Sequence, residues 1–271
     1  MSVLIIEIKK VKANARTYLG ILILWGLGVL IGINVWHNPQ LLPLRYLGFR
    51  LSGLYVPGLT LFPLALIGPI VTILIAGETI AGERIKGTLR MTLARPVSRR
   101  DVFLGKIALV VLYAVFIVFS TLLVTAILGI LLFGAGDVIM PADLGNLSSG
   151  FYSLESGEAL VRLLLAGTAV SIYIIAYGSI ALFFSSFLNH SLASPIFTLV
   201  LTATFTVLEN LEFFKPFSPY LITHHFLYWQ NFMIEQINWT GFTGSLTIIA
   251  LYIAACLCFG GIIFQWRDEV S

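Results

Sequence analysis

Charged side chains are scarce in this chain of 271 residues. Asp, Glu, Lys and Arg together make up 11% of it, whereas 58% of the residues are hydrophobic. Because a soluble domain carries about 25% charged residues, this chain has too little polar surface to stay in water as a globule. The apolar residues also come in long runs, which are typical of membrane-spanning helices. We therefore expect an integral membrane protein.

Cysteine is nearly absent as well. Cys256 and Cys258 are the two residues of this type, and their i, i+2 spacing points them to different faces of a helix. This spacing predicts neither a disulfide nor a metal pair. The adjacent His224 and His225 cannot share a helix face either. Histidines at the membrane interface are therefore favoured over metal ligands, and a metal role for them is left open.

Charged residues divide the chain into five long uncharged intervals, each longer than the roughly 20 residues that cross a bilayer core. The fourth, Leu163–Leu208, holds 46 residues, and as one helix it would extend about 69 Å. Its polar centre, Ser185–Ser191, is followed by Pro195, so we expect two helices there. Six spans are then predicted, at residues 18–35, 56–76, 102–133, 161–183, 191–208 and 241–264. Within them we expect no buried Asp, Glu, Lys or Arg.

Six spans place both chain ends on one side of the membrane. That side would carry twelve of the Lys and Arg residues, against four on the other side, namely Arg45, Arg50, Arg162 and Lys215. The positive-inside rule then predicts a multi-pass protein of the plasma (inner) membrane with both termini in the cytoplasm.

The N-terminus carries a basic segment before the first apolar run. This run is too long for a signal peptide and lacks a small-residue cleavage site, so a retained anchor is favoured. Residues 1–16 fit an amphipathic elbow helix in the membrane interface, in which Ile6 faces lipid while Glu7 and Lys9 stay in water.

The loop at residues 77–101 is densely charged. Within it, Ala81, Ile85 and Leu89 repeat every four residues, which predicts an apolar stripe for the bilayer edge or for a partner. Ser98 lies three residues before an aspartate and predicts a helix N-cap. The stretch Gly82–Thr88 looks like a phosphate-binding loop, but it lacks the lysine after the second glycine and a preceding strand. We therefore expect no ATP site in this chain.

The string GETIAGERIKGTLRMTLARPVSRRDVFLGK, residues 77–106, resembles the loop between the second and third helices of ABC type-2 permeases, the membrane subunits of exporters. The residues that match the family pattern are Glu78, Glu83, Gly87, Thr88, Leu89, Pro96, Val97, Ser98, Arg99 and Lys106. The resemblance implies a single all-α transmembrane domain over residues 1–271. Its parts would be six transmembrane helices, the elbow, a cytoplasmic coupling helix within the loop and short outer helices at residues 209–240.

The same resemblance implies a complex of two permease and two ATP-binding subunits. The coupling helix, Glu78–Gly87, would dock in a cleft of the ATP-binding subunit. The docking residues would be Glu78, Ala81, Glu83, Arg84, Ile85, Lys86 and Gly87. ATP would be bound and hydrolysed by that partner, so we expect no catalytic residue, cofactor, metal site or nucleic-acid partner for this chain.

The predicted function is the membrane-spanning permease of an ATP-driven exporter, which moves a lipid-like or amphipathic substrate and contacts a second permease copy and membrane lipids. Candidate pathway residues are Thr198, Thr202 and Thr206, although a threonine in a helix more often bonds back to its own backbone. Gly28 and Gly32 form a G-x-x-x-G pair, which permits a close helix contact and hints at a dimer.

Two alternatives stay open. An ion-coupled secondary carrier is disfavoured by the lack of intramembrane charge. A non-transporting scaffold would use the same charged loop to recruit a cytoplasmic protein.

Overall fold

The long helices of the chain follow from its apolar runs. The computed structural model describes residues 3–12, 15–38, 52–94, 97–141 and 151–267, so Arg45, Arg50 and Pro96 lie outside the described residues. Among the described residues, five helices are long and apolar enough to cross a membrane. They are α2 (Ala15–His37), α4 (Tyr55–Ile85), α6 (Arg99–Phe133), α7 (Ser156–Phe187) and α9 (Trp239–Trp266). By length and composition, these helices make the chain a multi-pass membrane protein.

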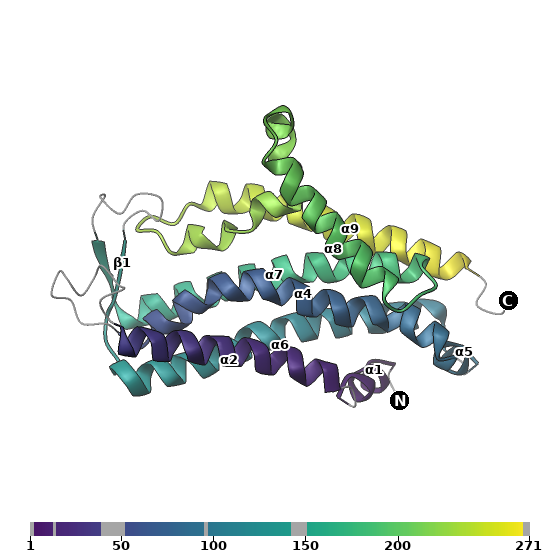
Figure 1. Cartoon of the computed structure of the whole chain (residues 1–271), viewed down its shortest axis with the longest axis horizontal. Coiled ribbons are helices and arrows are strands. Elements are labelled where there is room, and N and C mark those ends of the chain that lie inside the picture. Colours follow the sequence, from purple (N-terminus) through teal and green to yellow (C-terminus); the bar gives the residue numbers. More distant parts are fainter. Residues whose placement is uncertain (1–2, 13–14, 39–51, 95–96, 142–150, 268–271) are drawn as a thin grey trace.

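Helices α4 and α7 form the centre of the bundle. They pack against each other, α2 and α6 lie beside α4, and α9 lies beside α7 (Figure 1). Glycine permits the close approach of these helices. A Cβ at Gly68 would lie 2.5 Å from Ile174 Cδ1, and one at Gly178 would lie 2.5 Å from Val110 Cγ1. Many large apolar side chains, Leu123 among them, point outward, as expected for helices that face lipid.

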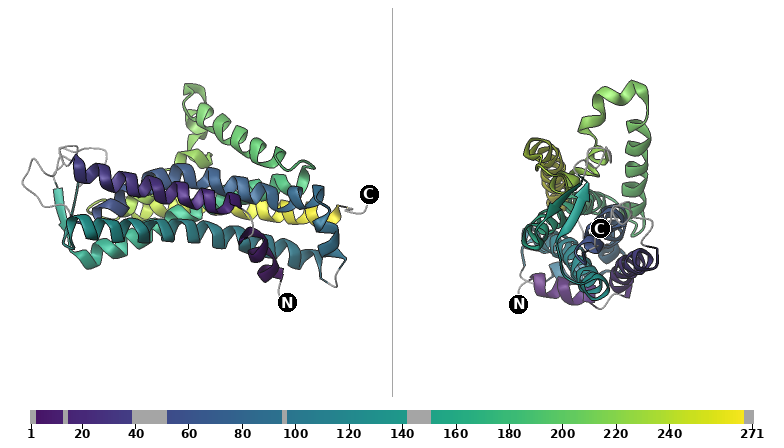
Figure 2. Two further views of the ribbon diagram at one scale, coloured as in Figure 1. Left: turned by 60° about the horizontal axis from the view of Figure 1, so that its bottom comes forward. Right: turned by 90° about the vertical axis from the view of Figure 1, so that its left-hand side faces the viewer.

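The two ends of the bundle differ in structure. One end carries α1 (Val3–Lys12) and the end of α9, and we call it the termini end. Figure 2 shows α1 turned out of line with α2. At the start of α6, Ser98 Oγ accepts a hydrogen bond from Asp101 N at 3.0 Å, which confirms the predicted cap.

The opposite end, the hairpin end, carries two strands that correct the expectation of an all-α chain. Strands β1 (Val138–Pro141) and β2 (Phe151–Leu154) pair antiparallel, with Val138 opposite Leu154. Both of these side chains are buried against Ala159 at the start of α7. The hairpin thus covers the apolar end of the bundle, a role that runs of four residues do not reveal in the sequence.

Helix α8 (Ala193–Glu209) begins packed on α4 and α7 but differs from the long helices. It has 17 residues and a length of about 25 Å, which is short of a bilayer core of about 30 Å. Three 3-10 helices follow it, η3 (Glu212–Tyr220), η4 (Ile222–His225) and η5 (Tyr228–Phe232). Pro216 and Pro219 in η3 prevent a continuous α-helix. Figure 1 shows α8 leaning away from the bundle, with η3 at its tip.

After η3 the chain returns to the bundle. Tyr252, halfway along α9, donates its hydroxyl to Tyr220 O at 3.0 Å, so η3 ends midway between the two ends of the bundle. Tyr228 donates to Ala169 O near the middle of α7. At the hairpin end, Tyr152 donates to Met233 O at 3.1 Å. The predicted outer segment at residues 209–240 therefore begins midway along the bundle rather than at its end.

Candidate functional site at the termini end

Four charged side chains form a closed ring of ion pairs at the termini end. Lys106 Nζ of α6 lies 2.9 Å from Glu83 Oε2 of α4 and 3.5 Å from Glu7 Oε2 of α1. Lys10 Nζ of α1 lies 2.8 Å from Glu83 Oε1 and 3.0 Å from Glu7 Oε1. Positive and negative groups alternate, so the ring joins α1, α4 and α6 without a net charge.

Helix periodicity positions the members of the ring. Glu7 and Lys10 are three residues apart on α1 and share a face. Glu83 follows Thr79 by about one turn of α4, and Lys106 Nζ also donates to Thr79 O at 2.6 Å. Lys106 lies about two turns inside α6, and none of its surface is exposed. Together these contacts supply the partners that a buried ammonium group requires.

Burial and ion pairing have opposite effects on the pKa of Lys10. Partial burial by itself would lower its pKa, but the hydrogen bonds and charges of Glu83 and Glu7 outweigh this and raise the pKa above 10.5. Lys10 therefore stays charged at neutral pH, as the alternation of the ring requires.

Two sequence-based expectations are wrong at these buried charges. Glu7 does not stay in water but is only 1% exposed, because the ring provides its partners. Buried charge also occurs inside two predicted spans, at Lys106 and at Arg162. Arg162 is 2.6 Å from Glu158 Oε1, so this charge too is paired. Pairing is what makes burial of a charge tolerable.

The predicted coupling helix is not a separate helix. Helix α4 continues through Glu78 to Ile85 and stops before Gly87, which has a φ of 69°. This left-handed conformation favours glycine. A short helix, α5 (Thr88–Leu93), follows the turn. The predicted docking segment is therefore the end of a membrane-length helix.

The seven predicted docking residues divide into an inner and an outer set. The inner set is Glu78, Ala81, Glu83 and Arg84. Ala81 is fully buried and Glu83 belongs to the ring. The outer set is Ile85, Lys86 and Gly87, and with Arg90 and Met91 of α5 it forms what we call the outer tip. Ile85 is 57% and Met91 64% exposed, and Lys86 and Arg90 are exposed beside them.

Hydrogen bonds attach the inner set to α7. Ser185 Oγ donates to Gly77 O at 2.6 Å and accepts from Ala81 N at 3.0 Å. Arg84 Nη1 donates to Leu188 O at 2.9 Å, just past the end of α7. The end of α4 is thus fixed to α1 and α6 by ion pairs and to α7 by hydrogen bonds.

The candidate pathway threonines bond to their own helix. Thr198, Thr202 and Thr206 each donate to the carbonyl four residues earlier, at 2.9, 2.8 and 3.0 Å. Thr198 is buried and Thr206 is exposed. The three hydroxyls therefore follow α8 from the bundle towards η3.

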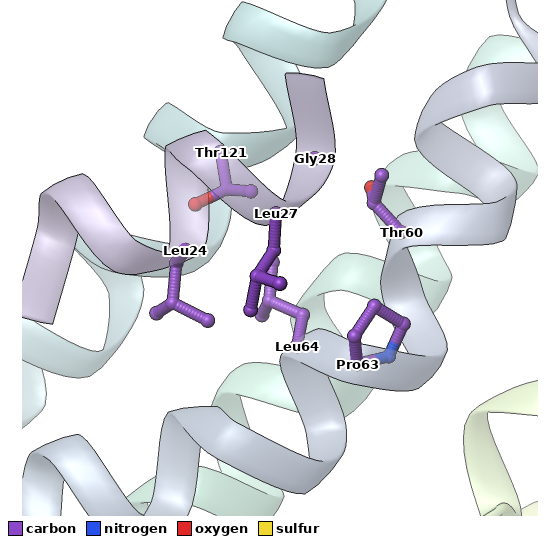
Figure 3. Close-up of a pocket in the computed structure, with 7 residues that line it drawn as sticks. All are labelled: Leu24, Leu27, Gly28, Thr60, Pro63, Leu64 and Thr121. Atoms are coloured by element: carbon purple, nitrogen blue, oxygen red, sulfur yellow. The ribbon is translucent and has the colours of Figure 1, made fainter. Parts of the chain in front are cut away.

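A pocket lies between α2, α4 and α6 (Figure 3). Its lining residues are Leu24, Leu27, Gly28, Thr60, Pro63, Leu64 and Thr121. The two hydroxyl groups of the lining already donate hydrogen bonds within their own helices. Thr60 donates to Pro57 O at 2.8 Å, and Thr121 donates to Ile117 O at 2.7 Å. The pocket offers apolar surface and little to orient a polar ligand.

The G-x-x-x-G pair is used inside the chain. A Cβ at Gly28 would lie 2.4 Å from Thr125 Cγ2, and one at Gly32 would lie 2.7 Å from Leu128 Cδ2. The expected close contact therefore joins α2 to α6, and this pair does not provide a surface for a second copy.

The two histidines have different partners. His224 Nδ1 lies 2.9 Å from Glu209 Oε1, whereas His225 Nε2 lies 2.9 Å from Pro219 O. Among the described residues, no group of three or more His, Cys, Asp or Glu side chains could hold a metal ion. Cys256 and Cys258 are both free thiols.

The sequence contains one signal for the ring, and it is Lys106. This lysine follows the N-cap Ser98 by eight residues, which places it inside an apolar helix, where a charge requires partners. The partner Glu7 is 99 residues away in the sequence. No local pattern indicates that α1 approaches α6, so the ring itself could not be predicted.

A family model described as "Protein of unknown function (DUF2705)" matches residues 45–270. The match includes Glu83 and Lys106 of the ring and begins after α1. A comparison with curated proteins gives no match.

Proposed function

The chain belongs to this family of unknown function, and we propose that it is the membrane-spanning permease subunit of an ATP-driven exporter of the ABC type-2 kind. A separate ATP-binding subunit binds and hydrolyses ATP, and a second permease copy completes the assembly. This chain holds no cofactor and performs no catalysis in this scheme. Its cargo is lipid-like or amphipathic, and it has no nucleic-acid partner.

The proposed topology has six crossings in the plasma (inner) membrane. The five long helices provide five of them, and α8 with the 3-10 helices provides a discontinuous sixth. The termini end is cytoplasmic, in line with the exposed cations Lys9, Lys86, Arg90 and Arg100 at that end. Helix α1 is the interfacial elbow.

The ring of ion pairs is the observation that carries the proposal. It fixes the end of α4, which bears the outer tip, to α1 and α6, while Ser185 and Arg84 fix it to α7. A displacement of the outer tip is therefore passed to four helices at once. An energy-coupling segment needs such rigid connections, whereas a loop that only joins two spans does not.

Docking is assigned to the outer tip, and the inner set transmits the motion. The exposed charges of the tip, Lys86 and Arg90, are positive, and the apolar Ile85 and Met91 lie beside them. The complementary surface on the partner is an apolar groove with an acidic rim.

An ion-coupled secondary carrier is the second candidate. It is favoured by an ionisable pair away from the membrane surface, namely Glu209 and His224 midway along the bundle.

Purification of the tagged full chain from its native membranes tests the proposal. A nucleotide-hydrolysing protein should co-purify with the natural chain and with the Lys9→Glu variant, which changes an exposed charge of α1. It should be lost from the double variant Lys86→Glu, Met91→Glu, because the added carboxylates oppose an acidic groove. Vesicles that transport with this chain alone, driven by an ion gradient, would instead establish the secondary carrier. Capture of a partner without nucleotide hydrolysis would indicate a scaffold.

A further inference from the structure

We propose that Glu209 and His224 form a binding site for the ammonium headgroup of an amphipathic cargo, midway across the membrane. That this ligand is transported rests on the proposed export function, whereas its binding at the site does not. The arm formed by α8 and η3 carries this site, and Figure 2 shows the arm standing off the bundle.

The depth of the site follows from hydrogen bonds at the end of η3. Tyr252 holds Tyr220 O halfway along α9, and Glu209 is the last residue of an α8 that is too short to cross the bilayer. Irregular backbone at membrane depth must be buried in protein or face a water-filled cavity. The segment η4–η5 meets this condition by burial, since Ile222 is 0% and Trp229 5% exposed.

The η3 segment does not meet that condition by burial. Phe213 is 82% and Phe217 57% exposed, and the side chains of Glu212 and Lys215 are 93% and 69% exposed. Charged groups this open at membrane depth require water or polar ligands beside them. The side of η3 that carries Glu212 and Lys215 therefore faces an aqueous pathway rather than lipid tails.

The charge of the site favours a cation. A carboxylate can only accept hydrogen bonds, so His224 Nδ1 donates to Glu209 Oε1 at 2.9 Å, and Ser218 Oγ lies 3.1 Å from the same nitrogen. The Glu209 side chain keeps 26% of its surface exposed and that of His224 46%. The C-terminus of α8, where Glu209 lies, adds the negative end of a helix dipole. Half-helix ends of this kind hold cations in transporters with broken helices.

Aromatic rings define the remaining chemistry. Phe213, Phe217 and Tyr220 of η3 are exposed close to Glu209 in the chain, and the face of an aromatic ring attracts ammonium groups. A carboxylate combined with aromatic faces fits an organic ammonium better than a hydrated metal ion or an anion. The exposed apolar surface around them suits a hydrocarbon tail.

The threonine stripe leads to the same place. Thr202 and Thr206 of α8 and Asn210, just past its end, lie at four-residue intervals, and each side chain donates to the backbone carbonyl four residues earlier. The hydroxyl oxygens keep lone pairs that can accept hydrogen bonds. The stripe therefore provides acceptors along the route to Glu209.

Binding of radiolabelled dodecyltrimethylammonium to the purified full chain tests the site. The chain is placed in lipid nanodiscs with no ATP-binding protein, and empty nanodiscs correct for partition into lipid. We expect saturable binding that unlabelled dodecyltrimethylammonium displaces and the same concentration of neutral dodecanol does not. Glu209→Gln should weaken binding at least about tenfold, as expected when a charged contact is lost. The control Glu155→Gln, an exposed carboxylate at the hairpin end, should leave the affinity within about twofold.

Phe213→Leu provides a second variant, because this exposed ring can be shortened without disturbing the core. It should weaken binding several-fold through the loss of the ring face. Equal affinities for Glu209→Gln and the natural chain, or displacement by dodecanol, would overturn the site. Binding with these properties in a chain that recruits no ATPase would preserve the site and remove the exporter, so the two proposals can fail separately.

Discussion

Lys106 and Glu83 pair at 2.9 Å, although several other cations lie closer to Glu83 in the sequence. The reason is solvation: Lys106 is fully buried, and a buried ammonium group requires a partner much more than one in water does. The exposed cations of the same segment, Lys86 and Arg90, remain on the outer tip. One charged stretch thus serves both internal attachment and an external surface.

Replacement of Lys106 should strongly destabilise the protein. Lys106→Met leaves the buried carboxylate of Glu7 and the largely buried carboxylate of Glu83 with one lysine between them. This should lower the free energy of unfolding by about 3–5 kcal/mol. Denaturant titration in detergent micelles measures this. Lys9→Met, an exposed lysine of α1, should change it by less than about 0.5 kcal/mol.

The double variant Lys106→Met, Glu83→Gln separates charge from packing. It leaves Lys10 and Glu7 as a balanced pair, so it should be more stable than Lys106→Met alone. A double variant less stable than the single one would mean that Lys106 acts mainly through its packing.

The contribution of Lys10 should depend on pH only in the alkaline range. Because its pKa is raised in the folded chain, its stabilising effect is complete below the unfolded value and disappears as pH rises through the folded value. Lys10→Met should therefore lower the stability by about 1 kcal/mol at neutral pH. The difference should shrink as the pH rises through the raised pKa of Lys10 in the folded chain. Thermal unfolding of Lys10→Met and of the natural chain, from neutral to alkaline pH, measures this difference in stability. A difference that changes near pH 7 would contradict the raised pKa of Lys10.

Loss of Arg84 should loosen the turn between α7 and α8. Arg84→Ala removes a charged hydrogen bond to Leu188 O at 2.9 Å, worth about 1.5–3 kcal/mol, and a longer contact to Ser186 O at 3.5 Å. Faster hydrogen exchange of the amides of residues 186–192 is the expected result. Lys86→Ala, at an exposed position two residues on, should leave that exchange unchanged. Unaltered exchange in Arg84→Ala would show that the turn is held by other contacts.

Two glycines of α2 form a matched pair for testing the α2–α6 contact. Gly28→Ala places a Cβ 2.4 Å from Thr125 Cγ2, whereas a Cβ at Gly26 meets nothing within 4 Å. We expect Gly28→Ala to lower the free energy of unfolding by about 1–3 kcal/mol and Gly26→Ala to have no such effect. Adding Thr125→Ser, which removes only the clashing methyl group, should restore most of the loss. Equal effects of the two alanine variants would place this face of α2 away from α6.

The long helices could be predicted because the bilayer fixes how many apolar residues a crossing needs. The capping by Ser98 could be predicted because it depends on residues three apart. The depth of η3 could not: Pro216 and Pro219 indicate a broken helix, but only the Tyr252–Tyr220 hydrogen bond places it midway along the bundle.

The candidate site could be predicted only in part, because its contacts also join residues far apart in the sequence. The charge of residues 77–106 is visible in the sequence, yet which side chains face inward depends on α1 and α7. Glu83 and Arg84 are adjacent, and one pairs with α6 while the other binds the end of α7. Long-range packing of this kind has no local sequence pattern.

The hydroxyl of Ser185 has a mechanical consequence. It occupies both the carbonyl of Gly77 and the amide of Ala81, so the backbone of α4 is tied to α7 in the turn between these two residues. This serine is a fixed point of contact between α4 and α7. Because the two helices are joined here, a tilt of the end of α4 moves α7 with it, and the central helix pair turns as one unit instead of bending locally.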